Sequence, residues 1–256
     1  MSTLLSNPRK YRLNPLIFSG LIFFCNLGES PAQVGRDTLQ LIVATAPDWN
    51  SHRASLQAFQ RASSRQPWQP VFRQPIPVLL GRNGLAWGRG LFQTPNSGAP
   101  QKRERDGRAP AGIFQLGQLF GYATQPPQGC RWPYHRVTQW DAYVDDPTLP
   151  EYNRHVQVDP RNVPPWFEKQ RMRLGDAAYT WMLEIRHNQQ PVVPGAGSAI
   201  FFHVRRGPDR PSSGCTTMRQ EDLEALLRWL DPAASPYYVL LPREDYLALR
   251  GSWRLP

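Results

Sequence analysis

Five short apolar runs along the chain are typical of buried β-strands. Each is rich in branched or aromatic side chains and is bounded by glycine, proline or polar residues. They cover residues 39–45 (LQLIVAT), 76–80 (IPVLL), 179–186 (YTWMLEIR), 199–204 (AIFFHV) and 237–241 (YYVLL). Three of the runs lie in the C-terminal third, so the pattern predicts that this part of the chain is the most regular.

Two other segments place apolar residues at the spacing of an amphipathic helix. Asp48 could cap a helix over residues 49–62, because a carboxylate can accept from the first free backbone N–H groups. A second helix is predicted over residues 218–230, with Thr217 and Gln220 as a capping box before it. The apolar stripes consist of Leu56 and Phe59 in the first segment and of Leu223, Leu226, Leu227 and Leu230 in the second.

Proline, glycine and polar residues fill the connections. Residues 66–77 carry four prolines, Asn83-Gly84 signals a turn, residues 92–108 are polar, and residues 117–140 are irregular and aromatic. The 27 prolines are about twice the usual share and are scattered, which disfavours a helical bundle. We therefore expect one mainly β domain with two or three helices.

The N-terminus has the pattern of an export signal. Basic residues precede a ten-residue apolar stretch at residues 16–25, which is shorter than the roughly 20 residues that span a bilayer. Ser30 and Ala32 then supply small residues at a cleavage site. We expect residues 1–32 to be a signal peptide cleaved after Ala32, and residues 33–256 to be the exported domain; the alternative is an uncleaved anchor. No later segment is apolar enough to cross a membrane.

The formal net charge of +10 narrows the choice of partner. In an exported protein, anionic membrane surfaces or wall polymers are more natural partners than nucleic acid. The chain has neither zinc-finger spacing nor an aromatic–basic RNA signature, so we expect no nucleic-acid partner. The alternative to an anionic partner is that the positive charge only keeps the surface solvated. The sequence does not indicate an oligomeric state.

Cleavage of the signal would leave two cysteines, Cys130 and Cys215. In an oxidising compartment the plain expectation is a disulfide. Cys215, however, follows Gly214 just before the second predicted helix, where backbone N–H groups would lower the pKa of a thiol. His203 ends a predicted strand upstream, and a cysteine with a histidine is the minimum for a nucleophile and its base. The alternative is that both are buried side chains without a catalytic role, which would give the same sequence pattern.

The blocks around these residues resemble the YkuD-like L,D-transpeptidases. Residues 197–203 (GSAIFFH) and 212–215 (SSGC) are similar to the active-site signature, in which a loop joins a histidine to Ser/Thr-His-Gly-Cys. Residues 107–114 (GRAPAGIF) resemble the family's Thr-Pro-x-Gly-x-Phe strand entry. A divergent bacterial branch is indicated by further blocks at residues 81–88 (GRNGLAWG), 144–147 (VDDP) and 187–188 (HN). The resemblance spans about residues 39–249 and implies a β-sandwich or barrel-like fold.

The resemblance assigns roles to three residues. It implies Cys215 as nucleophile, His203 as general base, and Gly214 as the motif glycine whose N–H, with that of Cys215, would stabilise an oxyanion. The chain departs from the family where Ser213 replaces the second motif histidine and where the loop after His203 is shorter than usual. Thr216-Thr217 also replaces an apolar residue followed by Arg or Asn. These changes put the wall-peptide specificity in doubt.

Four residues of the resembling blocks are candidates for substrate contact: Ser213, His187, Asn188 and Arg108. Arg108 could hold a carboxylate in a bidentate pair, and a structural salt bridge is its alternative. For His187 the alternative is a satisfied surface histidine. Asp145, in an Asp-Asp-Pro sequence that usually marks a turn, could bind a substrate amine.

The resemblance implies two-step acyl transfer between peptidoglycan stem peptides through a thioester on Cys215, in the periplasm or cell wall. It requires neither a metal nor another cofactor. One alternative is a hydrolase of the same fold, acting as a carboxypeptidase or endopeptidase on wall peptides. The other is a non-catalytic wall-binding domain, which a Cys130–Cys215 disulfide would favour.

Overall fold

The computed structural model describes residues 34–35, 37–91, 98–173 and 175–256. The expected signal peptide, residues 1–32, lies outside the described residues. So do residues 92–97 of the expected loop 92–108. Residues 31–256 form one compact unit. Within the described parts of the chain, no helix has the length and apolar character needed to cross a membrane.

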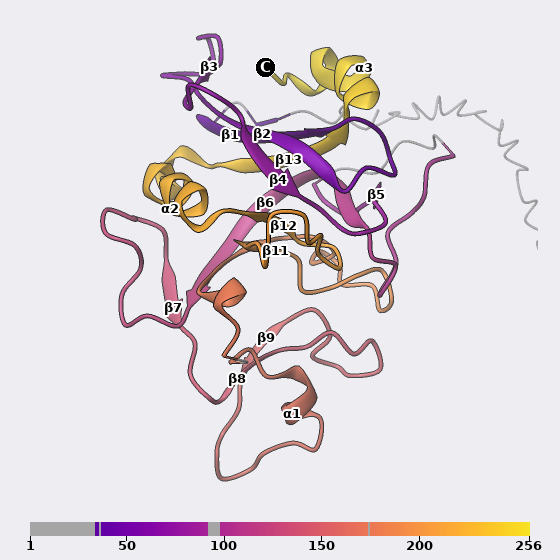
Figure 1. Cartoon of the computed structure of the whole chain (residues 1–256), viewed down its shortest axis with the longest axis vertical. Helices are drawn as coiled ribbons and strands as arrows, with labels where there is room; N and C mark the ends of the chain where they lie inside the picture. Colours follow the sequence, from indigo (N-terminus) through magenta and orange to yellow (C-terminus); the bar gives the residue numbers. More distant parts are fainter. Residues whose placement is uncertain (1–33, 36, 92–97, 174) are drawn as a thin grey trace, which may run out of the picture. The chain divides into compact units, whose positions relative to one another are not determined.

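A closed β-barrel forms the centre of the domain (Figure 1). Among the described residues, eight strands follow one another around it, and β2 closes the ring by pairing with both β4 and β1. In order around the barrel they are β1 (Gln40–Ala46), β13 (Tyr237–Pro242), β6 (Ala109–Gly121), β10 (Trp181–Ile185), β11 (Phe201–Val204), β12 (Thr216–Met218), β4 (Ile76–Leu79) and β2 (Arg53–Gln60). This confirms the expected mainly β, barrel-like fold in a single domain.

Short strands and helices surround the barrel. The strands β3 (Gln69–Pro70), β5 (Leu85–Trp87) and β7 (Tyr134–Arg136) extend it, whereas β8 (Asp141–Tyr143) and β9 (His155–Gln157) form a separate two-stranded sheet. The helices are α1 (Phe167–Gln170), α2 (Gln220–Trp229) and α3 (Arg243–Trp253), with single turns η1 (Ala177–Tyr179) and η2 (Pro232–Ala234). Figure 1 shows β8, β9 and α1 together on one side of the barrel, forming a small lobe that we call the β8–β9 lobe.

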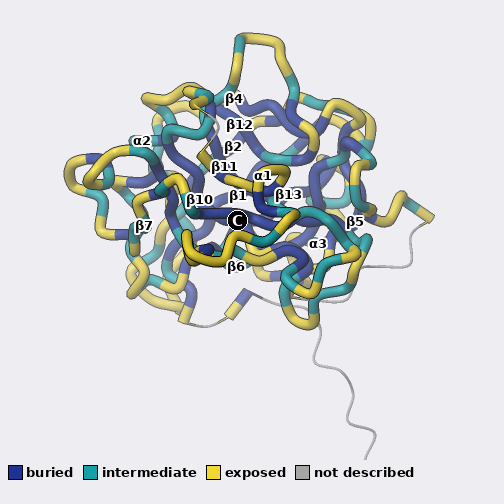
Figure 2. Tube along the Cα trace, turned by 90° about the horizontal axis from the view of Figure 1, so that it is seen from below, coloured by how far each residue is buried: buried dark blue, intermediate teal, exposed yellow. Residues whose placement is uncertain are grey.

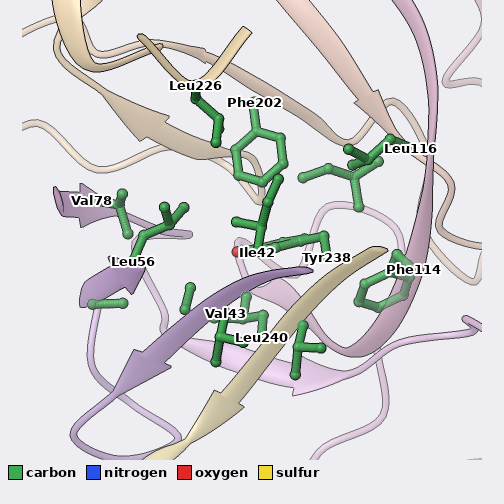
Figure 3. Close-up of a cluster of buried hydrophobic side chains, with 14 of the residues drawn as sticks. Ile42, Val43, Leu56, Val78, Phe114, Leu116, Phe202, Leu226, Tyr238 and Leu240 are labelled. Carbon is green, nitrogen blue, oxygen red and sulfur yellow. The ribbon is translucent and has the colours of Figure 1, made fainter. Parts of the chain in front are cut away.

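The barrel is filled by apolar side chains from strands that are far apart in the sequence. Figure 3 shows Ile42, Leu56, Phe114, Phe202 and Tyr238 packed together, and each of these side chains is fully buried. Burying such surface contributes about 25 cal/mol per Å², so the barrel interior is the main source of stability. In Figure 2 the buried residues follow the barrel strands, whereas exposed residues lie mostly in the connections.

The helix predicted over residues 49–62 is wrong, because most of this segment is the strand β2. Ala54, Leu56 and Ala58 point into the barrel with a period of two, while the residues between them face outward or are half-buried. Asp48 accepts from the N–H of Asn50 in a local turn instead of capping a helix.

The irregular segment predicted over residues 117–140 begins in fact with the end of β6, the longest described strand. Gly117 leaves the space that its neighbour needs, because a Cβ there would overlap the carboxylate of Glu184 on the neighbouring strand β10. Glu184 in turn accepts from the backbone N–H of Gln118. Glycine in this strand therefore permits close packing of a buried carboxylate.

The second predicted helix exists as α2 but begins later than expected. Thr217 belongs to β12, and its Oγ1 donates to the carbonyl of Leu79, so the expected capping box with Gln220 is absent. The helix buries its leucine stripe as predicted, with Leu223, Leu226 and Leu227 inward. As a consequence, Cys215 lies directly before a strand and not at a helix start.

Candidate active site

Cys215 and His203 line the same cavity, which has a volume of about 450 Å³. His203 is on β11, and Cys215 immediately precedes β12, which pairs with β11 in parallel; Phe202 is opposite Thr216. The resemblance implied that these two residues lie in one site, and the barrel brings them to one cavity by placing the two segments side by side. The remaining lining residues are Arg82, Lys102, Glu104, Arg105, Asp145, Tyr179, Ser198, Ala199, Ile200, Arg206, Ser212, Ser213 and Gly214.

The thiol of Cys215 is held in its neutral form. Desolvation by the surrounding protein raises the pKa of Cys215 to about 11, although a hydrogen bond from the Phe201 backbone and the charge of Arg206 act in the opposite direction. The residue as a whole is half-buried, so it still opens to the cavity. Its Sγ donates to the carbonyl oxygen of Ala199 at 3.6 Å. The expected lowering of this pKa by a helix start is therefore wrong.

Neither cysteine of the described chain is paired. Cys130 and Cys215 are both free thiols, and they pack against different clusters of apolar residues. The disulfide expected for an oxidising compartment is therefore absent, and with it the feature that favoured a non-catalytic wall-binding domain.

The imidazole of His203 is oriented and neutral. Its Nδ1 lies 2.8 Å from the Val204 carbonyl oxygen, so Nδ1 carries the proton and Nε2 is left as the basic nitrogen. Burial lowers the pKa of His203 to about 4, and the charge of Arg206 adds to this effect. The ring of Tyr179 lies 5.1 Å from the imidazole, centroid to centroid. His203 is therefore an unprotonated base at neutral pH.

A tight turn sets the approach to Cys215. The hydroxyl of Ser212 donates to the Cys215 carbonyl at 2.6 Å and accepts from the N–H of Gly214 at 3.0 Å. A Cβ at Gly214 would lie 3.0 Å from the carbonyl oxygen of Arg108, so a side chain would press on the neighbouring strand. The N–H of Gly214, which was expected to face an oxyanion, is thus already engaged. Ser212 was not anticipated as the residue that shapes this turn.

Another part of the cavity wall is the loop around Ala199, whose supporting residue Asn153 the sequence analysis did not identify. Ala199, whose carbonyl meets the thiol, has a left-handed backbone (φ +53°), and its N–H donates to Asn153 Oδ1 at 3.1 Å. Asn153 Nδ2 also donates to the carbonyls of His187 and Asn188, both at 2.8 Å. Asn153 comes from the β8–β9 lobe, and no periodic pattern marks it in the sequence.

A second set of contacts fixes the same loop. Ser198 Oγ donates to Glu104 Oε2 at 2.7 Å, and the hydroxyl of Tyr152 donates to the same carboxylate oxygen. Tyr152 in turn accepts from the N–H of Gly197 at 3.1 Å. The position of the Ala199 carbonyl therefore depends on the β8–β9 lobe through both Tyr152 and Asn153.

Basic groups outnumber acidic ones around the cavity, with four and two side chains respectively. Lys102 is buried and paired with Asp106 at 2.6 Å, Arg206 is paired with Asp176 at 2.8 Å, and Arg82 donates to Ser213 Oγ at 3.1 Å. Arg105 is exposed and forms no ion pair within the described parts of the chain. Because Asp106 and Asp176 already pair with Lys102 and Arg206, Arg82 and Arg105 are the basic groups of the cavity that remain to attract a ligand carboxylate.

Three of the expected substrate contacts lie elsewhere. His187 is buried: its Nδ1 accepts from the N–H of Arg89, its Nε2 donates to the Ala196 carbonyl, and burial lowers its pKa to about 3. Asn188 is bonded to the backbone of Val193 and Gly197.

Arg108 donates to the carbonyls of Trp49 and Leu85, so its side chain links two separate backbone segments. His187, Asn188 and Arg108 do not line the Cys215 cavity, because their polar groups are used to hold the backbone around it. Ser213, by contrast, does line the cavity, beside Arg82.

Comparison with known families assigns most of this domain. Residues 53–239 match the model of the YkuD family, described as the L,D-transpeptidase catalytic domain. Searches of the curated proteins and of the solved structures gave no significant match. The matched range includes His203 and Cys215; of the barrel strands it lacks β1 and the last three residues of β13. On the family match and the barrel together, the chain belongs to the YkuD family of L,D-transpeptidase catalytic domains.

Proposed function

We propose that this chain is an exported cysteine acyltransferase that acts on peptidoglycan stem peptides. The observation that carries the proposal is a free thiol and a neutral, oriented imidazole in one open cavity of a YkuD domain. Family membership supports a peptidoglycan substrate. The roles of Cys215 and His203 rest on the motif they share with the family and on their common cavity.

In the first step Cys215 Sγ attacks the carbonyl carbon of the L-centre in a stem tetrapeptide. Because the thiol is protonated in the free protein, its proton passes to Nε2 of His203 as the S–C bond forms. The C–N bond then breaks, and His203 returns this proton to the departing D-amino acid. A thioester on Cys215 remains.

In the second step an amine of a neighbouring stem attacks the thioester. His203 accepts a proton from the amine and delivers it to Sγ as the C–S bond breaks, which restores the starting state. If water replaced the amine, the same sequence would give hydrolysis, the alternative activity. No metal takes part in either step.

The charges around the cavity support a substrate with several carboxylates. Arg105 is exposed and forms no direct ion pair among the described residues, although its charge also acts on Asp146, so we assign it to a substrate carboxylate. Asp145 lines the cavity as well and is suited to an amine of the donor or acceptor.

Mass spectrometry of the products from purified muropeptide tetrapeptides tests this function. The wild-type protein is expected to release a D-amino acid and to form a cross-linked dimer, while Cys215→Ala folds but gives neither. Cys130→Ser is the matched control and keeps most of the activity. Release without a dimer would favour the hydrolase, and release by Cys215→Ala would overturn the assignment of the nucleophile.

We also propose export through residues 1–32. Expression in a bacterial host with its signal peptidase, followed by N-terminal sequencing, is expected to give a mature chain that begins at Gln33. A chain that keeps its first 32 residues would instead support an uncleaved anchor.

A further inference from the structure

Three side chains of the β8–β9 lobe and its edge converge on a single point outside the Cys215 cavity. His135 Nε2 and His155 Nε2 each lie 2.7 Å from the same oxygen, Asp141 Oδ1. These three atoms all lie within 4.8 Å of one another. Asp141 is completely buried, whereas the side chains of His135 and His155 are 31% and 26% exposed. The cluster therefore has a buried anionic base and a side that is open to water.

The neighbours of the cluster orient all three groups. The second oxygen of Asp141, Oδ2, accepts from the N–H and the hydroxyl of Thr138 at 2.7 and 2.6 Å. This leaves Oδ1 directed at the two imidazoles. Phe120 of β6 packs against both rings, with centroid distances of 5.7 Å to His135 and 4.9 Å to His155. Such outer contacts are what hold metal ligands in position in known sites.

We propose that His135, Asp141 and His155 form a binding site for a divalent transition-metal ion, of which Zn²⁺ fits best. Two imidazole nitrogens and one carboxylate oxygen are ligands that Zn²⁺ prefers, and water can occupy a fourth position on the exposed side. Bond lengths of 2.0–2.2 Å in a tetrahedron separate ligand atoms by about 3.3 Å. Each Nε2 would thus need to move away from Oδ1 by less than about 1 Å, and the two Nε2 atoms, which lie within 4.8 Å of each other, would need to approach that spacing, which partly exposed rings can do.

Binding would exchange hydrogen bonds for coordinate bonds without net release of protons from the histidines. In the metal-free protein both imidazoles donate Nε2–H to Asp141 Oδ1. With the ion bound, each imidazole would carry its proton on Nδ1 and present the lone pair of Nε2 to the metal. The carboxylate charge offsets half of the charge of the ion.

The position of the site makes it structural and not catalytic. Its ligands come from β7, β8 and β9, so the ion would fasten the β8–β9 lobe to the barrel. None of the three ligands lines the Cys215 cavity. The same lobe supplies Tyr152 and Asn153 to the Ala199 loop, so the ion would steady that loop through the lobe.

Titration of the metal-free, untagged full chain with Zn²⁺ in a calorimeter tests the proposal. We expect one equivalent to bind and the Tm to rise. His135→Gln and His155→Gln are expected to weaken binding on the order of 100-fold, because each removes a ligand at a partly exposed position. His52→Gln, which changes a half-buried histidine outside the cluster, is the matched control and keeps the wild-type affinity.

Histidine modification gives a readout that needs no variant. Zn²⁺ is expected to protect His135 and His155, but not His52, from diethyl pyrocarbonate, as mapped by peptide mass spectrometry. Absence of zinc binding by the wild-type chain, or equal protection of all three histidines, would overturn the proposal. So would wild-type affinity in both glutamine variants. None of these results bears on turnover by Cys215.

Discussion

His203 and Cys215 face one cavity from adjacent parallel segments, and burial keeps both of them neutral. A thiolate–imidazolium pair would need the opposite shifts, with the pKa of the thiol below that of the imidazole. The free protein therefore holds a thiol and a base, and proton transfer must accompany attack on the substrate. This relationship leads to two predictions about pH.

The first concerns alkylation of Cys215. Because its pKa is raised to about 11, the thiolate fraction should increase about tenfold for each pH unit up to that value. In a Cys130→Ser background, we expect the rate of reaction with iodoacetamide to rise in this way between pH 7 and 10. A rate that levels off below pH 8 would show a thiolate already formed and would contradict the neutral pair.

The second concerns His203 as the base. With its pKa lowered to about 4, the imidazole stays unprotonated at neutral pH, so kcat/KM should be flat from about pH 6 to 8 and fall below about pH 4. Replacing it by His203→Gln should lower kcat/KM by about 10²- to 10⁴-fold. His52→Gln serves as the control. A decrease in kcat/KM centred near pH 6.5 would mean that His203 is not desolvated in solution.

Asn153 is predicted to support catalysis without touching substrate. Asn153→Asp keeps the left-handed backbone accessible (φ +58°) but replaces an amide that donates to two carbonyls. The loss of these donors should lower the free energy of unfolding by about 1–3 kcal/mol and reduce kcat, as the Ala199 carbonyl loses its support.

Urea unfolding and steady-state kinetics measure the two effects of Asn153→Asp. Asn162→Asp, in an exposed turn, is the control and should change neither quantity. If the Asn153→Asp protein were less stable but had unchanged kinetics, the Ala199 loop would have no role in catalysis, which would contradict the prediction.

Buried neutral histidines should make the protein sensitive to acid. Burial lowers the pKa values of His187 to about 3 and of His203 to about 4, so between those values and about 6.5 the unfolded chain binds more protons than the folded one. Their contribution is complete above pH 6.5 and is lost as the pH falls. Between pH 7 and 4.5 the free energy of unfolding should drop by roughly 2–3 kcal/mol for each histidine.

Urea unfolding at the two pH values checks this dependence. His187→Gln should show a smaller difference between pH 7 and 4.5 than the wild-type chain, because one of the two buried histidines is gone. Equal stability at both pH values would contradict the neutral, buried state of these side chains.

The sequence was informative where a pattern is local. All five apolar runs contain most of a barrel strand, and the leucine stripe of α2 is where its spacing predicted. The Cys–His motif predicted the shared cavity because His203 lies on β11 and Cys215 directly precedes the adjacent strand β12. The failures have tertiary causes: β2 resembled a helix through the spacing of Leu56 and Phe59. The irregular pattern of residues 117–140 hid the end of β6, where Gly117 packs against Glu184.

The sequence could not predict the charge state of Cys215 or the distant residues that hold the Ala199 loop in place. The pKa of Cys215 depends on the desolvation that the folded cavity imposes, which no neighbour in the chain reveals. Asn153 and Tyr152 act on a loop more than 40 residues away, so only the folded chain shows them. The same holds for His135, Asp141 and His155, whose convergence requires three separate strands.

Intact-protein mass spectrometry of the acyl-enzyme tests the central claim most directly. After brief mixing with a stem tetrapeptide and acid quenching, the chain should gain the mass of the tetrapeptide minus the mass of the free D-amino acid, because the thiol hydrogen leaves with that amino acid. Peptide mapping should place the adduct on Cys215, and Cys215→Ala should form none. An adduct on another residue, or turnover in Cys215→Ala, would contradict the account.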